Sequence, residues 1–281
     1  MQAEKFGTWE SAVSWLLANP DHIDLCQSCY YDRPALGAAR RYLASAEWQA
    51  LRAFMPKRDG AALDVGAGMG IAAFALASDG WETHALEPDV SELVGAGAIR
   101  RLAAEGNVKI SVVREWGESL PFSDGRFQLV HARQVLHHAR ELPKFCQELF
   151  RVLVPGGVLL ATREHVISGP AQLPKFLAKH PLHKYYGGEN AYTLNTYLQA
   201  LRAAGFTITK TLGPLESVIN YAPFTEDSLC QAIAGQASRI PGGKLLANIA
   251  LAPLWRKAML PLLSKLDRRP GRLYTFVATK P

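Results

Sequence analysis

The chain has 281 residues, 48% of them hydrophobic and 20% charged, and a formal net charge of +6. These proportions exclude intrinsic disorder, and no uninterrupted apolar run reaches the roughly 18 residues of a membrane span. Four scattered cysteines exclude a disulfide framework. Because no apolar leader follows a basic start, we expect a cytoplasmic protein.

The chain is expected to divide into two parts. Residues 1–60 are predicted to form an N-terminal helical cap, and residues 61–281 a larger domain. Two stretches of this domain, at about 165–192 and 220–271, break its rhythm and are predicted to be insertions.

The cap is predicted from two amphipathic runs. The first follows Thr8 and stops before Pro20, and the second covers residues 43–55. Between them, Cys26 and Cys29 form a C-x-x-C pair, but no second pair is present to complete a zinc site. No metal site is therefore predicted.

From Ala61 onward, short apolar strands alternate with helical segments. Strands are expected over residues 61–65, 81–86, 108–113, 126–132, 158–163, 206–212 and 273–279. Helices are expected over residues 70–80, 90–105 (opened by Asp89), 141–153 and 195–204. This alternation predicts an α/β fold with a seven-stranded, mainly parallel sheet and helices on both faces.

A glycine-rich loop follows the first strand. Its spacing is D-x-G-x-G-x-G, with Asp64 preceding Gly66, Gly68 and Gly70. A dinucleotide loop of the G-x-G-x-x-G type would need glycine where Ile71 stands. The carboxylate would repel a pyrophosphate but could bind an ammonium group. The loop therefore favours a nucleoside that carries an amino acid.

A second carboxylate, Glu87, stands at the end of the second predicted strand. An acid at this place can accept hydrogen bonds from both hydroxyls of a ribose. Together, the loop and Glu87 predict a nucleoside site at the carboxyl ends of the strands.

Four motifs in fixed order resemble the class I S-adenosylmethionine-dependent methyltransferases, most closely those that methylate small molecules. The motifs are LDVGAGMG, ALEPD, WGESLPFSDGRFQLVHARQVLHH and LVPGG. The resemblance covers residues 60–163 strongly and 195–281 in outline. It implies a Rossmann-like sheet with an antiparallel last strand, S-adenosylmethionine as cofactor and S-adenosylhomocysteine as product.

The resemblance also implies which residues contact the cofactor. It assigns the methionine part to Asp64 and the glycine loop, the ribose to Glu87, and the adenine to the segment after the third strand. Trp116 stands where many relatives have a short acid or amide, so it could stack on the adenine. The implied cofactor-binding residues are Asp64, Gly66, Ala67, Gly68, Glu87, Pro88, Trp116, Gly117, Glu118 and Arg133.

Candidate catalytic residues follow the fourth and fifth predicted strands. His165 and Glu164 come after the fifth strand and His137 after the fourth, at the edge where the cofactor is expected. Histidine is the usual proton acceptor near neutral pH, so His165 is the first candidate for a general base and His137 the second. The alternative for His137 is a packing role at a helix start.

The acceptor is predicted to bind at the insertion over residues 181–192, which is rich in tyrosine and polar side chains. Tyr30 and Tyr31 are candidates for a lid over the cofactor, with core packing as the alternative. The expected function is methyl transfer to oxygen or nitrogen of a small molecule.

Three alternative hypotheses concern the acceptor and the activity. Residues 236–281 carry nine Lys or Arg and one acid, so an alternative is a lipid-linked or saccharide acceptor at a membrane reached through the basic segment 236–272. Nucleic acid is not expected, because HARQ stands where amino-methylases of bases carry an N/D-P-P-Y/F motif. A cofactor-binding subunit without turnover is the non-enzymatic alternative.

Overall fold

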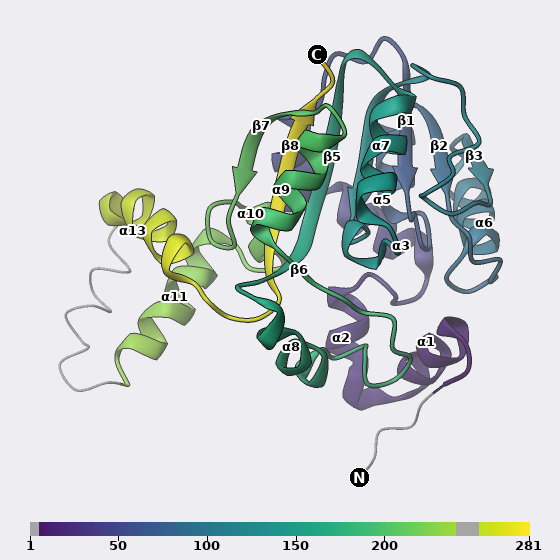
Figure 1. Cartoon of the computed structure of the whole chain (residues 1–281). Helices are drawn as coiled ribbons and strands as arrows, with labels where there is room; N and C mark the ends of the chain where they lie inside the picture. Colours follow the sequence, from purple (N-terminus) through teal and green to yellow (C-terminus); the bar gives the residue numbers. More distant parts are fainter. Residues whose placement is uncertain (1–5, 240–252) are drawn as a thin grey trace.

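A mainly parallel β-sheet forms the centre of the protein, and helices cover both of its faces (Figure 1). The computed structural model describes residues 6–239 and 253–281. Its strands are β1 (Ala61–Val65), β2 (Glu82–Leu86), β3 (Ile110–Val113), β4 (Phe127–Arg133), β5 (Leu153–Ile167), β6 (Tyr192–Thr193), β7 (Thr207–Leu212) and β8 (Arg272–Thr279).

The strands lie side by side in the order β3-β2-β1-β4-β5-β8-β7. The last strand, β8, runs antiparallel to both of its neighbours, β5 and β7. The predicted Rossmann-like sheet with an antiparallel last strand is therefore confirmed. One short strand was not predicted: β6 pairs in parallel with the end of β5.

The helices alternate with the strands along most of the chain. They are α1 (Trp9–Ala18), α2 (Ile23–Ser28), α3 (Ala35–Leu43), α4 (Ala46–Arg52), α5 (Ile71–Ser78), α6 (Ala96–Gly106), α7 (Leu142–Val152), α8 (Leu173–Lys179), α9 (Leu194–Ala203), α10 (Val218–Tyr221), α11 (Glu226–Ala237) and α13 (Pro253–Leu266). Short 3₁₀ helices cover Pro20–His22, Leu136–His138 and Pro170–Gln172.

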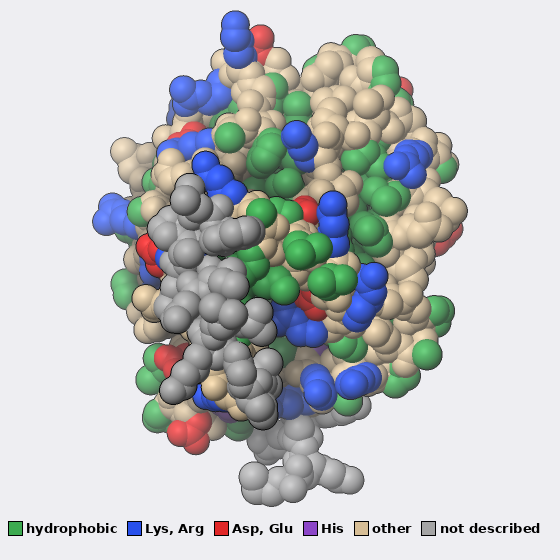
Figure 2. All heavy atoms as spheres, turned by 90° about the vertical axis from the view of Figure 1, so that its left-hand side faces the viewer, with side chains coloured by type: hydrophobic (Ala, Val, Ile, Leu, Met, Phe, Trp, Pro, Cys, Tyr) green, Lys and Arg blue, Asp and Glu red, His purple; other side chains and the backbone are tan. Residues whose placement is uncertain are grey.

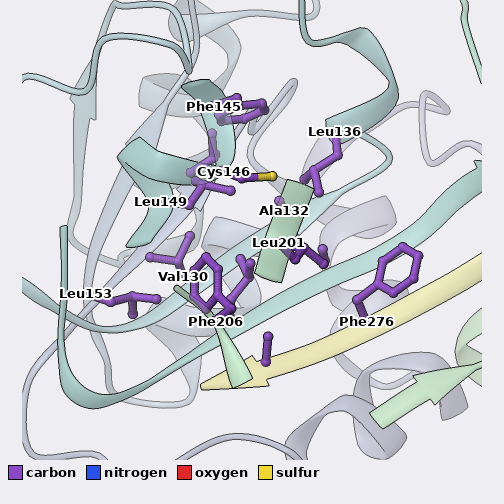
Figure 3. Packing of buried hydrophobic residues seen from close by; sticks show 14 of the residues in the cluster. Val130, Ala132, Leu136, Phe145, Cys146, Leu149, Leu153, Leu201, Phe206 and Phe276 are labelled. Atoms are coloured by element: carbon purple, nitrogen blue, oxygen red, sulfur yellow. The ribbon is translucent and has the colours of Figure 1, made fainter. Parts of the chain in front are cut away.

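Successive residues of a strand face opposite helix layers, because side chains alternate along a strand. On one face, α7 and α9 pack around Val130, with Phe145 and Leu201 in the same cluster (Figure 3). On the other face, Leu129 lies in a cluster with Trp48 of α4. The sheet is therefore covered on both sides, as its apolar strands require.

One predicted helix start is wrong. The helix expected from residue 90 begins only at Ala96. Before it, Asp89 accepts a hydrogen bond from the backbone N–H of Ser91, and the Ser91 hydroxyl accepts bonds from the N–H groups of Leu93 and Val94. Such local side-chain bonds compete with helical ones, so the segment forms turns first.

The fifth strand is longer than predicted, and its extension carries two of the candidate catalytic residues. It runs to Ile167, because β8 pairs with it as far as Val166. The pairing register shifts between Ala161 and Glu164, and Arg163 has φ +59°. A bulge of this kind changes the direction of side chains and often stands beside a site.

The carboxyl ends of the parallel strands are covered by α1, α2 and α8 (Figure 1). The N–H of Phe6 donates to the carbonyl of Tyr185 at 2.8 Å, and the Tyr185 hydroxyl lies 3.1 Å from Nε2 of His22. The N-terminal helices and the segment around Tyr185 thus form one cover. By contrast, α3 packs on α5 beside the sheet. The proposed division at residue 60 stays a prediction.

Part of the predicted basic segment, residues 240–252, lies outside the described residues. On the face that carries α11 and α13, Lys and Arg side chains are interspersed with hydrophobic ones (Figure 2). None of the helices in the described part of the chain has the length and hydropathy that a transmembrane helix needs.

Candidate active site

The glycine loop connects β1 to α5 at the point where strand order reverses. Its three glycines lie in the left-handed region, which residues with a Cβ rarely adopt. Their φ values are +62° for Gly66, +54° for Gly68 and +83° for Gly70. A Cβ on Gly66 would lie 2.7 Å from a methyl carbon of Val135, whereas a Cβ on Gly68 would meet nothing within 4 Å. Any larger residue at position 66 would therefore clash with Val135, whereas the described residues leave open space beside Gly68.

Asp64 lies at the end of β1 and is 2% exposed. Its Oδ1 accepts a hydrogen bond from Nδ1 of His131 at 2.8 Å, while its Oδ2 is buried without a partner among the described residues. A buried carboxylate oxygen without a donor is costly, so it fits a ligand that brings one. Sequence reasoning missed His131, although a histidine inside an apolar strand was a signal.

Glu87 connects the end of β2 to the glycine loop. Its Oε2 accepts from the N–H of Gly68 at 2.7 Å, and its Oε1 accepts from the N–H of Asp89 at 3.0 Å. Burial raises the pKa of Glu87 to about 7. The neighbouring Ala67 donates its N–H to the carbonyl of Leu86 at 3.1 Å, and Pro88 is partly buried beside the loop. The structure therefore brings Glu87 and Pro88 together with the glycine loop.

The segment after β3 lies against the start of α7. Trp116 is 55% exposed, and the Arg140 guanidinium lies 4.8 Å from the centre of its ring. Glu118 accepts a hydrogen bond from the N–H of Arg140 at 2.8 Å, and Gly117 packs against Phe145. Trp116 is thus an exposed aromatic surface, while Glu118 holds the loop before α7.

Arg133, at the end of β4, is bound to the N-terminal region instead of lying free in the site. Its Nε donates to Glu47 of α4 at 2.7 Å, and the rings of Tyr30 and Tyr42 lie beside its guanidinium. Arg163 also faces Glu47, at 3.7 Å. Glu47 is 1% exposed, and sequence reasoning missed it because nothing in its helix distinguishes it from a surface acid.

The ends of β4 and β5 meet at Glu164, which is 0% exposed. Its two oxygens accept hydrogen bonds from the backbone N–H groups of Val135, Leu136 and His137, at 3.0–3.1 Å. Nδ1 of His137 donates to the same carboxylate at 2.7 Å. Through these hydrogen bonds, the Glu164 carboxylate stabilises the turn after β4.

The His137 ring lies between two carboxylates. Its Nε2 is 3.4 Å from Oε2 of Glu189, which belongs to the predicted acceptor-binding insertion. Burial alone would lower the pKa of His137, but Glu164 and Glu189 raise it to about 9. For Glu189, burial would raise the pKa, but His137 and two neighbouring histidines lower it to about 2. The sequence predicted that the acceptor binds at this insertion, but Glu189 was not among the predicted site residues.

His165 lies beside this pair. Its Nδ1 donates to the carbonyl of Gly271 at 3.0 Å, and its Nε2 is buried without a partner among the described residues. Its ring centre is 4.8 Å from that of His137 and 5.1 Å from that of His180. Burial, followed by the charge of His137, lowers the pKa of His165 to about 3. The imidazole is therefore neutral, with a lone pair facing the cluster.

Backbone strain also gathers here. Gln134, which follows β4, and Arg163, at the bulge inside β5, have φ values of +57° and +59°. Such conformations cost about 1–3 kcal/mol each and cluster at functional sites. The predicted lid residues differ in their surroundings: Tyr31 packs edge-on against Trp9 in the cover, and Tyr30 against Tyr42.

This chain is similar in sequence to known methyltransferases. A family model described as "Methyltransferase domain" matches residues 63–161. An uncharacterized methyltransferase, YodH of Bacillus subtilis, is 30% identical over 182 residues, which are 63% of this chain and 73% of that protein.

Solved structures show the same fold at low identity. The geranyl diphosphate C-methyltransferase of Streptomyces coelicolor, solved with S-adenosyl-L-homocysteine, is 15% identical, with a TM-score of 0.58 over 95% of this chain and 88% of that one. The [4+2]-cyclase SpnF is 21% identical, with a TM-score of 0.55 over 87% of this chain and 81% of that one. The fold is therefore shared by proteins of different chemistry.

Proposed function

Because this chain belongs to the class I S-adenosylmethionine-dependent methyltransferases, we propose that it transfers the methyl group to an oxygen or nitrogen atom of a small-molecule acceptor. The observation that carries the proposal is the direct packing of the glycine loop on the turn that leads into the histidine cluster. Gly66 faces Val135 so closely that a Cβ on Gly66 would lie 2.7 Å from the Val135 side chain. The N–H groups of Val135 and His137 both bind Glu164.

The residues of the glycine loop fit the cofactor. Oδ2 of Asp64, which no described residue contacts by a hydrogen bond, suits the ammonium group of the methionine part. The space that the described residues leave beside Gly68 admits a ligand close to the backbone. Glu87 keeps lone pairs for the ribose hydroxyls beyond its two backbone bonds. When bound, S-adenosylmethionine supplies an electrophilic methyl group that is transferred by in-line displacement.

Asp64→Asn is expected to weaken binding of S-adenosylmethionine by about 10–100-fold. The change removes the charge but keeps the shape, and a charge-assisted hydrogen bond contributes about 1.5–3 kcal/mol. Isothermal titration calorimetry measures the effect, with Asp59→Asn as control, because Asp59 is exposed just before β1. Equal affinities for both variants would contradict the assignment of Asp64.

Binding of the cofactor is expected to strengthen by up to about tenfold as the pH rises from 6 to 8. Glu87, with a pKa of about 7, faces the carboxylates of Asp89 and Asp64 and is mostly protonated at the lower pH. Only the ionised form offers all its lone pairs to the ribose, so deprotonation favours binding. Calorimetry across this range should show the slope in the wild type and a flat profile for Glu87→Gln; parallel profiles would refute the role of Glu87.

We place the acceptor at the cluster of His137, His165 and Glu189. His165 presents a neutral Nε2 that has no partner in the described part of the chain, which suits a contact to the acceptor's O–H or N–H group. Glu164 and His137 act as positioning residues, since their bonds fix the turn beside the glycine loop. The cover formed by α1, α2 and the segment around Tyr185 excludes water and favours a small acceptor.

A methyl-transfer screen tests the acceptor class. The full chain is incubated with methyl-labelled S-adenosylmethionine and extract fractions of polar small molecules, lipids, nucleic acid and protein. We expect label in the polar small-molecule fraction, and NMR of the product to show an O-methyl or N-methyl group. Label confined to another fraction, or a new C-methyl group, would overturn the proposal.

A second candidate function is methylation of a lipid-linked or saccharide acceptor at a membrane surface. It is favoured by α13, where Leu262 and Leu266 are 58% and 63% exposed beside Lys265. Flotation with vesicles that contain anionic lipid separates the two candidates. Co-flotation that is lost in Leu262→Ser/Leu266→Ser supports this alternative, and absence of flotation removes it.

A further inference from the structure

We infer that His137, His165 and Glu189 bind a divalent transition-metal ion of the zinc type. The inference rests on the proposed function and deepens it: the ion lies between Nε2 of His165 and the acceptor's oxygen, so that His165 contacts the acceptor through the ion. One possible ligand atom from each of the three residues lies within 4.8 Å of the other two. The residues come from the turn after β4, the end of β5 and the insertion before β6, so only the fold brings them together.

The separations suit a small cation. Nε2 of His137 and Oε2 of Glu189 are 3.4 Å apart. In a tetrahedral zinc site with bonds of about 2.0–2.2 Å, neighbouring ligand atoms are roughly 3.3–3.6 Å apart. The ligand atom of His165 lies within 4.8 Å of the other two, so a side-chain shift on the order of 1 Å completes the same geometry.

Both histidines are oriented as metal ligands usually are. Nδ1 of His137 donates to Glu164 at 2.7 Å, and Nδ1 of His165 donates to the carbonyl of Gly271 at 3.0 Å. These acceptors keep the proton on Nδ1 and direct Nε2 of each ring toward Glu189. Metal-binding histidines commonly have such an acceptor on the other ring nitrogen.

Unpartnered atoms point to a missing ligand. Nε2 of His165 and Oε2 of Glu189 are both buried without a hydrogen-bond partner among the described residues, and His165 is only 7% exposed. The ion pair between His137 and Glu189 does not satisfy His165. A buried polar atom without a partner destabilises the folded state, and a bond to a metal ion would supply the missing partner.

The ligand types and their number select the ion. Two imidazoles and one carboxylate favour zinc or iron over calcium and magnesium, which prefer oxygen ligands alone. Two further histidines lie near Glu189: Nε2 of His138 is 3.9 Å from its Oε2, and Nδ1 of His180 is 3.8 Å from its Oε1. Neither belongs to the group of described residues whose ligand atoms all lie within 4.8 Å of one another. Three protein ligands leave a coordination position for an acceptor oxygen.

Zinc binding to the untagged full chain tests the inference. The protein is stripped with a chelator and titrated with Zn²⁺ against a chromogenic competitor at mildly alkaline pH, because bound imidazoles must be neutral. We expect about one zinc per chain and affinities about 100-fold lower or worse for His165→Gln and for Glu189→Gln. His84→Gln is the matched control, because His84 lies on β2 beside Glu82. Thermal melts verify that each variant is folded.

Three outcomes decide. Zinc at less than about 0.1 equivalent in the wild type, or unchanged affinity in both variants, overturns the site. A visible Co²⁺ spectrum that disappears in Glu189→Gln supports it, and Glu164→Gln should weaken binding by about 10–100-fold by releasing the His137 ring. If zinc binds at these residues but the screen finds no methylated small molecule, the metal site stands and the proposed acceptor class fails.

Discussion

Glu47→Gln is expected to lower the free energy of unfolding by about 3–5 kcal/mol, because breaking a buried ion pair leaves an uncompensated charge. Glu47 is 1% exposed and faces two arginines, with distances of 2.7 Å to Arg133 and 3.7 Å to Arg163. The guanidinium of Arg163 also donates to the carbonyls of Ile219 and Ala222. One carboxylate thus connects α4 to the ends of β4 and β5 and to α10.

Urea denaturation measures this effect. The control is Glu92→Gln, because Glu92 pairs with Arg101 at 2.9 Å but its side chain is 72% exposed. Exposed pairs contribute about 0–1 kcal/mol, so this variant should unfold almost as the wild type does. Equal losses in both variants would show that the network around Glu47 is not special.

The loss should depend on pH in a defined direction. Burial alone would raise the pKa of Glu47, but Arg133 and Arg163 lower it below its ordinary value of 4.5. The carboxylate therefore stabilises the fold above about pH 4.5, and its contribution disappears as the pH falls through the lowered pKa. The difference between wild type and Glu47→Gln should accordingly shrink in acid.

The contacts among the proposed cofactor-binding residues could be predicted from the sequence because their determinants are local. Asp64 and the glycines lie within seven residues of one another, and Glu87 ends the next strand. A parallel sheet brings the carboxyl ends of neighbouring strands together, so Glu87 reaches the N–H of Gly68. Here strand order alone fixes which groups meet.

The contacts around the proposed acceptor site could not be predicted in the same way, because they join residues that are far apart in the sequence. Glu189 meets His137 across 52 positions only because the insertion folds back onto the turn after β4. Glu47 meets Arg133 across 86 positions from a helix with no unusual composition. The bulge at Arg163 is also invisible in the sequence, since it arises from pairing with β8.

The segment before α6 shows a different kind of failure. Helical periodicity was present from residue 90, but Asp89 and Ser91 satisfy the nearby N–H groups with their side chains. Periodicity records which residues are buried, whereas the first turn of a helix depends on where backbone donors find acceptors. The helix therefore begins only where Ala96 follows Gly95.

Replacing His165 with Ala is expected to reduce the methylation rate by about 100-fold or more while the affinity for S-adenosylmethionine changes by only a few-fold. Nε2 of the buried His165 has no partner among the described residues and lies at the proposed acceptor position, whereas the proposed cofactor contacts come from the glycine loop and Glu87. The measurements are initial rates of S-adenosylhomocysteine release with the acceptor found in the screen, and calorimetry for the cofactor.

Two further variants separate contact with the acceptor from simple packing. His84→Ala removes a histidine from β2 and should leave the rate unchanged. Glu164→Gln keeps the volume but weakens the hold on His137 and the turn after β4, so its rate should fall less than that of His165→Ala. An amine acceptor that arrives neutral needs alignment more than proton removal, so the loss in His165→Ala would then be smaller. A full rate for His165→Ala with every acceptor would show that this histidine only packs, and His137 would become the candidate for contact with the acceptor.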